Sequence, residues 1–328
     1  MAGGTGMDGR PGVFCVFVVG PTATGKTRFA IDLALALDGE VINADSMQVF
    51  RGFDLGTAKP TVEETRGVKH HMIDVADPAA DDGWSVAVFA ERAREAISSV
   101  SGAGRLPIVA GGSGLYINSL IYDMDFSGAG RDEGFRREIV EIPSKHSPEA
   151  LYAILKSMDA EAALAIHPNN TKRVARAIER LRSGGEHGSV RGFPESFRPS
   201  ASIVPFILRL TMERGALYER IDERARAFVG SGLIEEVRGL MGSGVSPGAN
   251  AMQGIGYKEI AAFLKGDCDI ETAVSLIQRN TRRFAKRQET WFKRLDADAV
   301  FDMTVPGGYG DSLEAAVEAV SAARSAAR

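Results

Sequence analysis

The chain has 328 residues, of which 44% are hydrophobic and 25% charged, a composition that excludes disorder as the default state. A net charge of −4 excludes a protein coated in basic charge, and two cysteines are too few for a disulfide framework or a four-ligand zinc site. No apolar run reaches the ~20 residues that span a bilayer, and residues 1–12 lack the features of a signal peptide. We therefore expect a cytoplasmic protein with a flexible leader over residues 1–12 and no membrane partner.

Short apolar strands alternate with helical patterns in the first part of the chain. Strands are predicted at VFCVFVV, EVINA and LPIVA, and helices over residues 27–37, near 86–100 and from Gly114 onward. Continuous apolar strands separated by helices are typical of a parallel sheet that is covered on both faces. The predicted fold class is therefore α/β, with a doubly wound parallel sheet.

The pattern changes after residue 130. Residues 131–200 carry helical periods followed by a Gly-rich and Ser-rich stretch, which predicts an inserted helical domain. A strand is predicted again at SIVPFILRL, followed by a long helix over 270–295, a short strand at AVFDM and an Ala-rich terminal helix. Residues 13–130 and 201–328 are therefore assigned to one α/β core with C-terminal helices.

The segment GPTATGKT lies between the first predicted strand and the first predicted helix. Gly20, Gly25, Lys26 and Thr27 fill every fixed position of the P-loop pattern G-x-x-x-x-G-K-[ST]. In such a loop, backbone N–H groups and the helix N-terminus face an anion, the lysine neutralises phosphate oxygens and the threonine can hold Mg²⁺. The segment predicts a phosphate site in a P-loop core, but kinases, hydrolases and enzymes with a diphosphate leaving group all use one.

The second predicted strand is followed by polar residues. Ligands of an open α/β sheet lie beyond the carboxyl ends of its strands, so Asp45, Ser46 and Gln48 should face the ligand of the phosphate loop. An aspartate at this place can cap a helix, bind Mg²⁺ or act as a general base. Thr57 and Lys59 in the adjoining GTAKP are more polar groups than a cap would need. This segment alone does not separate a kinase from a transferase.

Seven blocks between about residues 13 and 294 together resemble the tRNA dimethylallyltransferases of bacteria. They are GPTATGKT, NADSMQVFRGFDLGTAKP, HHMIDVADP, GGSGLY, NTKRVARAIE, GIGYKE and RNTRRFAKRQETWFKR, in this order. The resemblance implies that the phosphate loop and Mg²⁺ hold the diphosphate of dimethylallyl diphosphate as a leaving group, with no ATP consumed. It implies transfer of the prenyl group to N6 of adenine 37 in tRNAs that read codons beginning with U.

The resemblance also implies roles for individual residues. Asp45 would be the general base, and Ser113 and Arg220 would be further catalytic residues, with Arg220 favoured over Arg214 and Arg224 as the arginine that reaches the diphosphate. Thr27 would hold Mg²⁺. The diphosphate would be bound by Gly20, Pro21, Thr22, Ala23, Thr24, Gly25, Lys26 and Thr27. The tRNA would be bound by Asp45, Ser46, Met47, Gln48, Ser113, Arg136, Arg173, Arg176, Gln253, Gly254, Ile255, Gly256, Tyr257, Lys258, Arg283 and Arg287.

Cationic residues gather over residues 279–294, where seven cations occur with one acid in a chain of net charge −4. Phe284, Trp291 and Phe292 are interleaved with them. At helical spacing we expect these aromatic side chains to face the core and the cations to meet tRNA phosphates, although a solvated helix with a core stripe fits the same pattern. We expect this helix and the inserted domain to grip the anticodon stem-loop, and the protein to be a monomer.

Three other functions stay open. An adenylate isopentenyltransferase would share the first blocks but would not need the basic helices or GIGYKE. A small-molecule kinase would place ATP at the phosphate loop and would not depend on a prenyl diphosphate. An RNA-binding GTPase-like switch would need a guanine-reading N-K-x-D sequence, which the chain lacks.

Overall fold

The computed structural model describes residues 12–79, 84–124, 148–182, 198–304 and 307–327. The chain divides into two compact units, one of Met1–Tyr122 with Pro199–Arg328 and one of Asp123–Arg198. The sequence predicts the insertion over 131–200, so its expected start lies eight residues inside the second unit (131 against 123). Apart from Gly12, the leader predicted over residues 1–12 lies outside the described residues.

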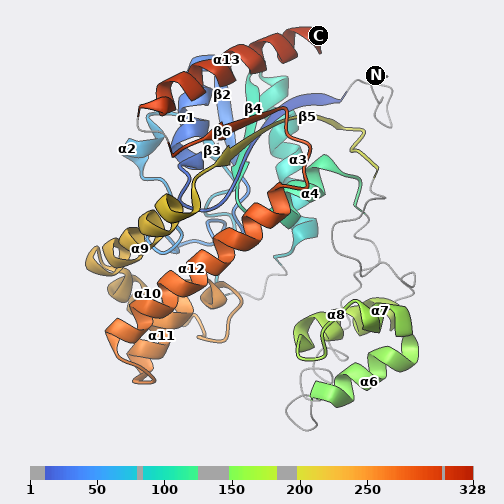
Figure 1. The fold of residues 1–328 in the computed structure, drawn as a ribbon, viewed down its shortest axis with the longest axis vertical. Helices are drawn as coiled ribbons and strands as arrows, with labels where there is room; N and C mark the ends of the chain where they lie inside the picture. The colour runs from blue at the N-terminus through green and yellow to red at the C-terminus, as the bar shows by residue number, and fades with distance from the viewer. Residues whose placement is uncertain (1–11, 80–83, 125–147, 183–197, 305–306, 328) are drawn as a thin grey trace. The chain divides into compact units, whose positions relative to one another are not determined.

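The first unit is built on a six-stranded sheet with the strand order β3-β2-β4-β1-β5-β6, in which every pairing is parallel (Figure 1). The strands are β1 (Val13–Val19), β2 (Gly39–Asn43), β3 (His70–His71), β4 (Leu106–Gly111), β5 (Ile203–Thr211) and β6 (Ala299–Asp302). The predicted doubly wound α/β fold is confirmed. Only β3 is absent from the sequence analysis, because a two-residue edge strand carries no apolar run.

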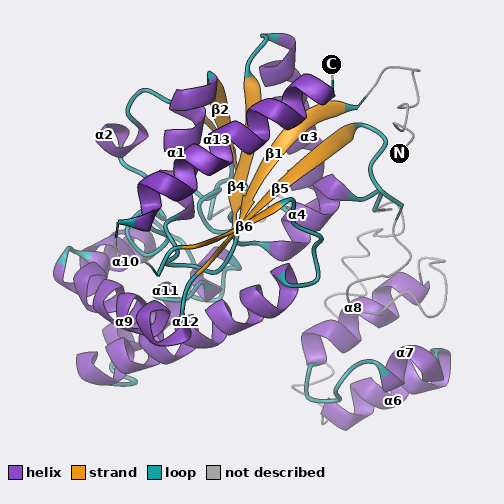
Figure 2. Cartoon of the chain, turned by 45° about the horizontal axis from the view of Figure 1, so that its top comes forward, coloured by secondary structure: helices purple, strands orange, loops and turns teal. Residues whose placement is uncertain are grey.

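Helices cover both faces of this sheet, as Figure 2 shows. On one face α1 (Lys26–Leu37) packs against α13 (Gly308–Ala326), and the two enclose a core with alternate residues of the strands, among them Val16, Val18 and Leu208. The other face carries α3 (Val86–Gly102) and α4 (Gly114–Ile121), which also pack together. Because both faces are covered, β1 and β4 are almost wholly apolar and buried.

The remaining helices of the first unit form a separate layer at the carboxyl ends of the strands. They are α9 (Arg214–Gly230), α10 (Leu233–Gly242), the 3₁₀ turn η1 (Ala251–Gln253), α11 (Tyr257–Lys265) and α12 (Ile270–Phe292). The loop after β2, which also carries the short α2 (Val62–Thr65), contributes Val49, Phe50 and Phe53 to the core of this layer. Through these three buried side chains, the loop packs against the helices that follow β5.

Several helix boundaries follow from capping side chains. Asp269 accepts the Thr272 N–H at 2.8 Å and thereby starts α12, and Ser85 accepts the Val88 N–H at 3.4 Å at the start of α3. Gly266 takes φ +82°, which closes α11 in the left-handed conformation that glycine favours. These local signals explain why the predicted starts of α3 and α12 agree with the structure.

The described part of the second unit consists of α6 (Pro148–Met158), α7 (Ala160–Leu164) and α8 (Thr171–Arg182). Leu151, Leu155, Val174 and Ile178 are fully buried in a small core of their own. This unit therefore has its own hydrophobic core.

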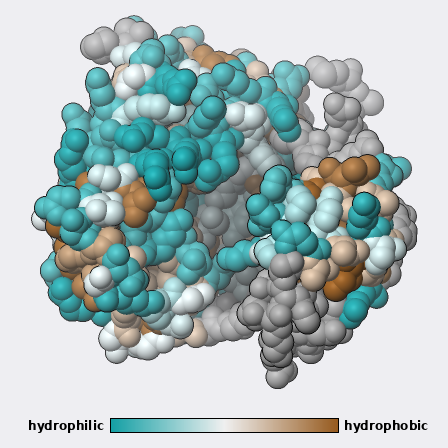
Figure 3. Space-filling view, turned by 60° about the horizontal axis from the view of Figure 1, so that its bottom comes forward, coloured by the Kyte–Doolittle hydropathy of each residue, from teal (hydrophilic) through white to brown (hydrophobic). Residues whose placement is uncertain are grey.

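The described surface is mainly hydrophilic. On the face drawn in Figure 3, hydrophobic residues form small separate groups among hydrophilic ones. Val62 and Leu164 are the most exposed large hydrophobic side chains of the described residues, at 84% and 87%. No helix in the described ranges combines the length and apolarity that crossing a bilayer requires.

Two leucines of α1 provide a matched test of this packing. Leu33 is 0% exposed and Leu35 is 48% exposed, on the same helix two residues apart. We expect Leu33→Ala to lower the free energy of unfolding by about 2–5 kcal/mol, because it leaves a cavity under the sheet. Leu35→Ala should change it by less than about 1 kcal/mol, since it empties no core space. Urea unfolding followed by circular dichroism measures both, and equal losses would contradict the packing described for α1.

Candidate active site

The phosphate loop connects β1 to α1 at the carboxyl end of the sheet. A Cβ atom at Gly20 would lie 2.3 Å from the Leu210 carbonyl oxygen, and the φ of Gly20 is +148°. Gly25 takes φ +89° directly before α1. Both places exclude side chains or strain them, which is the physical reason for the two fixed glycines of the pattern.

Two side chains of the loop fold back onto it. The Thr24 hydroxyl and Lys26 Nζ both donate to the Pro21 carbonyl oxygen, at 2.8 and 2.6 Å. Thr24 is 1% exposed and does not line the cavity above the loop. Of the eight residues predicted to bind diphosphate, the five that line this cavity are Thr22, Ala23, Gly25, Lys26 and Thr27. Gly20, Pro21 and Thr24 instead shape the loop.

An arginine of α9 reaches this loop. Arg224 Nη2 donates to Thr22 Oγ1 at 2.6 Å, and Arg224 lines the cavity. Arg220, which is favoured on the resemblance, is exposed and lies outside the cavity, as does Arg214. Arg220 and Arg224 are one helical turn apart on the same face, so the packing of α9 decides which of them meets the loop.

Burial lowers the pKa of both Lys26 and Arg224. Burial lowers the pKa of Lys26 to about 7, an effect that Asp45 opposes and Arg224 reinforces. Burial also lowers the pKa of Arg224, again opposed by Asp45 and reinforced by Arg220. An anion between Lys26 and Arg224 would therefore favour the charged forms of both side chains.

Asp45 lies directly beyond β2. Its N–H donates to Asn43 Oδ1 at 3.2 Å, and its Oδ1 accepts the Met47 N–H at 2.8 Å. Within the described ranges, Oδ2 accepts no hydrogen bond, and Asp45 lines the cavity above the phosphate loop. One carboxylate oxygen thus caps the turn, while the other is available to a ligand.

Two adjoining cavities meet at Asp45. The first has a volume of about 520 Å³ and contains the phosphate loop, and the second, of about 310 Å³, lies toward α9 and α12. They share Thr22, Asp45, Thr57 and Arg224. The second cavity has aromatic walls at Phe228 of α9 and Phe284 of α12. A carboxylate therefore stands between a compartment that contains the phosphate loop and a compartment with aromatic walls.

The Gly-Gly-Ser turn after β4 supports the Asp45 loop. Ser113 Oγ accepts the Ser46 N–H at 2.9 Å, and Ser113 lines neither cavity. The structure thus places Ser113, predicted as catalytic and as tRNA-binding, beneath the loop that carries Asp45. Gln48 does line the first cavity, and its Nε2 donates to the Thr57 carbonyl oxygen at 3.0 Å.

The segment Gln253–Lys258 lines the second cavity together with Ser46 and Met47, as expected for a shared site. The side chain of Tyr257 differs from this pattern, because it is 0% exposed. Its ring lies against Gly56, and its hydroxyl donates to Glu236 Oε1 at 2.6 Å. The Tyr257 side chain therefore supports the segment from within the core, and contact of this residue with tRNA stays a prediction.

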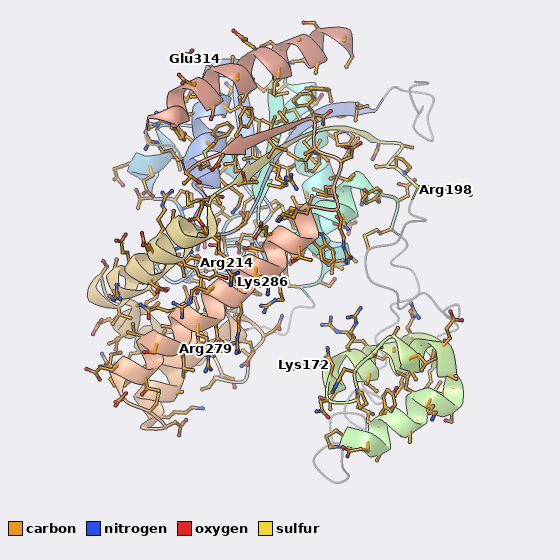
Figure 4. The ribbon with its side chains drawn as sticks, in the orientation of Figure 1. Lys172, Arg198, Arg214, Arg279, Lys286 and Glu314 are labelled. Carbon is orange, nitrogen blue, oxygen red and sulfur yellow. The ribbon has the colours of Figure 1, made fainter. Side chains whose placement is uncertain are left out.

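The cations predicted on α12 are exposed. Arg283 and Arg287 both reach solvent, and Arg287 also lines the second cavity, its guanidinium 5.8 Å from the centre of the Phe284 ring. Figure 4 shows Arg279 and Lys286 on the same helix. Of the cations named on α12, Arg287 is the one that lines the second cavity.

The aromatic residues of α12 do not all face the core. Phe292 is 1% exposed, and Trp291 packs against Gly114 at the start of α4. Phe284 lines the second cavity, so the expectation of a core position is wrong for this residue. The sequence analysis also passed over Phe228, although Ile221, Arg224 and Phe228 recur at the spacing of one helix face and together line that cavity.

The second unit carries the other predicted cations. Arg173 and Arg176 are exposed on α8, and Arg136 lies outside the described residues. Within this unit, α8 packs on α6 around the small hydrophobic core.

The first cavity contains donor oxygens that suit Mg²⁺. The Thr27 hydroxyl and the Asp45 carboxylate both line it. In the described ranges, no three His, Cys, Asp or Glu side chains gather to hold a metal by themselves. Mg²⁺ is typically held by one or two protein oxygens, substrate phosphates and water, and this donor set fits that pattern.

The sequence is similar to known proteins over most of its length. The family model for IPP transferase matches residues 48–295. The tRNA dimethylallyltransferase of Alkaliphilus metalliredigens is 43% identical over 289 residues, covering 88% of this chain and 91% of that protein. The corresponding protein of Bacillus pumilus is 41% identical over 299 residues, covering 91% and 92%.

Solved structures agree with these relatives. The tRNA isopentenylpyrophosphate transferase of Bacillus halodurans aligns with a TM-score of 0.68 and 39% identity, covering 94% of this chain and 97% of that one. A eukaryotic dimethylallyltransferase acting on tRNA aligns with a TM-score of 0.79 and 26% identity, covering 96% and 80%. The resemblance inferred from the sequence blocks is confirmed, and the chain belongs to the IPP transferase family.

Proposed function

We propose that this protein transfers a dimethylallyl group from dimethylallyl diphosphate to N6 of an adenine in tRNA and releases diphosphate. The observation that carries the proposal is the position of Asp45, between the cavity of the phosphate loop and a second cavity with aromatic walls. The names of the relatives, tRNA dimethylallyltransferases, support the same reaction. Following the family resemblance, we further propose adenine 37 of tRNAs that read codons beginning with U.

The donor diphosphate is assigned to the first cavity. Lys26 and Arg224 provide two positive charges there, and the phosphate loop lies at the N-terminus of α1. As the allylic C–O bond breaks, negative charge grows on the diphosphate, and these cations stabilise it more strongly in that state than before. Thr27 would hold Mg²⁺, which when bound supplies further positive charge to the diphosphate oxygens.

The target adenine is assigned to the second cavity. Phe228 and Phe284 offer aromatic faces to a base, and Arg287 lies beside them at the rim. The base would have to leave its stack, at a cost on the order of a few kcal/mol that contacts in the cavity offset. Its N6 would then approach Asp45, whose Oδ2 accepts the amine proton as the new C–N bond forms.

The exposed cations are assigned to the tRNA backbone. Arg283 and Arg287 on α12, with Arg173 and Arg176 on α8, are exposed in their respective units and suit phosphate contacts. Arg136 keeps this assignment from the resemblance alone. Such contacts position an RNA without reading its sequence, so the choice of adenine rests on the second cavity.

A transfer assay with labelled dimethylallyl diphosphate and Mg²⁺ tests the function. Unmodified tRNA and AMP are offered in parallel, and ATP is omitted. We expect label in tRNA alone, and Asp45→Asn should lower turnover by ~10²–10⁴ while tRNA binding is kept, since the variant loses the general base. Asp38→Asn is the matched control, because Asp38 is 81% exposed and lines neither cavity.

Each other outcome of that assay has a definite meaning. Label in AMP would favour an adenylate isopentenyltransferase, and label in neither acceptor would favour a kinase, with ATP as the next ligand. Wild-type turnover by Asp45→Asn would remove Asp45 from the mechanism.

Salt dependence of tRNA binding tests the role of α12. Replacing Arg283 and Arg287 with Ala should weaken binding and lower the slope of log K against log salt by about 1 to 2, because two phosphate contacts are lost. The control pair Lys69→Ala and Arg105→Ala removes the same charge at the amino ends of β3 and β4, away from the cavities. Equal slopes for both double variants would mean that α12 is merely a solvated face.

Proton uptake tests the charge of Lys26. Its pKa is about 7 without ligand, so Lys26 is mostly neutral at pH 8. Bound diphosphate favours the protonated amine and raises this pKa, so binding takes up a proton and weakens as pH rises above 7. Calorimetry at pH 8 in buffers of different ionisation enthalpy should show about one proton more for wild type than for Lys26→Arg, whose guanidinium stays charged. Equal uptake would contradict the lowered pKa.

A further inference from the structure

Gln288 of α12 joins two loops of the site with one buried amide. Its Oε1 accepts the Thr22 N–H of the phosphate loop at 2.8 Å, and its Nε2 donates to the Gly112 carbonyl oxygen at 2.9 Å. The residue is 5% exposed and lines neither cavity. Gln288 therefore does not touch a ligand in either cavity, but both groups that it binds belong to loops that line the first cavity.

The surroundings of Gln288 are built to admit this side chain. A Cβ atom at Gly112 would lie 2.1 Å from Gln288 Nε2, so only glycine lets the amide approach the turn. One helical turn further along α12, a Cβ at Gly114 would lie 2.4 Å from the Trp291 ring. The close approach of α12 to this turn is a packing reason for glycine at both positions.

The connection continues from Gly112 to Asp45. The next residue, Ser113, accepts the Ser46 N–H through its hydroxyl at 2.9 Å and donates its own N–H to the Ala44 carbonyl oxygen at 3.2 Å. Ala44 and Ser46 flank Asp45. The amide of Gln288 is thus the link between the phosphate loop and the turn on which the Asp45 loop rests.

We propose that Gln288 is a positioning residue that sets the phosphate loop and the Asp45 loop at a working separation, and joins both to α12. The inference rests on the proposed function, because that function assigns the diphosphate to one loop and the base to the other. A shift of either loop would separate the leaving group from the base, and small misplacements of reacting groups cost large factors in rate.

Loss of Gln288 is expected to affect binding of the prenyl donor and not binding of tRNA. Gln288 lies on the buried side of α12, whereas Arg283 and Arg287, the cations assigned to tRNA, are exposed on the same helix. Loss of the amide should therefore affect diphosphate affinity and turnover, and should leave the Michaelis constant for tRNA nearly unchanged. A merely structural role would lower stability without this division.

The test compares Gln288→Met with Gln278→Met. Both remove a glutamine amide of α12, and Gln278 Nε2 donates only to the Asp222 carbonyl oxygen of α9, at 3.1 Å. We expect Gln288→Met to weaken binding of inorganic diphosphate with Mg²⁺ about tenfold, because a loop amide loses its partner. It should also lower kcat and raise KM for the prenyl diphosphate, with KM for tRNA within about twofold of wild type. Gln278→Met should retain the wild-type diphosphate affinity, kcat and both KM values.

A second variant approaches the same contact from the other side. Gly112→Ala should displace the flexible amide of Gln288 and reproduce the loss of diphosphate affinity, even if Gln288→Met folds poorly. Equal diphosphate affinity and kinetics for wild type, Gln278→Met, Gln288→Met and Gly112→Ala would overturn the proposal.

Diphosphate binding is measured without the transfer reaction. A failure of the proposed function can therefore be distinguished from a failure of the role given to Gln288. If the wild type binds diphosphate but labels no tRNA, the proposed function fails and the affinity comparison still decides the anchoring of the phosphate loop by Gln288. If the wild type labels tRNA and the Gln288 and Gln278 variants behave alike, only the role of Gln288 fails. A wild type that binds no diphosphate would overturn both.

Discussion

The electrostatic balance around Asp45 is the constraint on which the site depends. Lys26 and Arg224 are both desolvated, and in each case Asp45 is the charge that opposes the loss of the proton. Both pKa shifts are opposed by the same carboxylate, which lines the cavity above the phosphate loop together with Lys26 and Arg224. In the proposed reaction, a bound diphosphate would favour the charged forms of the same two cations, and Asp45 would accept the amine proton.

The helix α12 contributes to several parts of this site. It presents cations to solvent, contributes Phe284 and Arg287 to the second cavity, and sends Gln288 to the phosphate loop. The sheet supplies loops that begin at the ends of the neighbouring strands β1, β2 and β4. Packing of one long helix across these loops gives them a common support.

Much of the site could be predicted, because its signals are local. The phosphate loop is readable since the glycines and the lysine act within eight residues, and the sheet is readable since buried parallel strands are continuously apolar. Arg224, Ser113, Tyr257 and Phe284 were placed differently by the structure for one shared reason. Each lies where its backbone is easily predicted, but its side chain direction depends on which distant element packs against it.

By itself the sequence determined the α/β class, the P-loop, the position of Asp45 after a strand and the membership of the family, since each of these is written in short contiguous patterns. Only the tertiary structure decided that Arg224 meets the loop, that Ser113 supports Asp45 from below, and that Gln288 binds Thr22 across 266 residues of chain. Those contacts join segments with no sequence relation to each other. They are selected by close packing of whole elements, which no local pattern records.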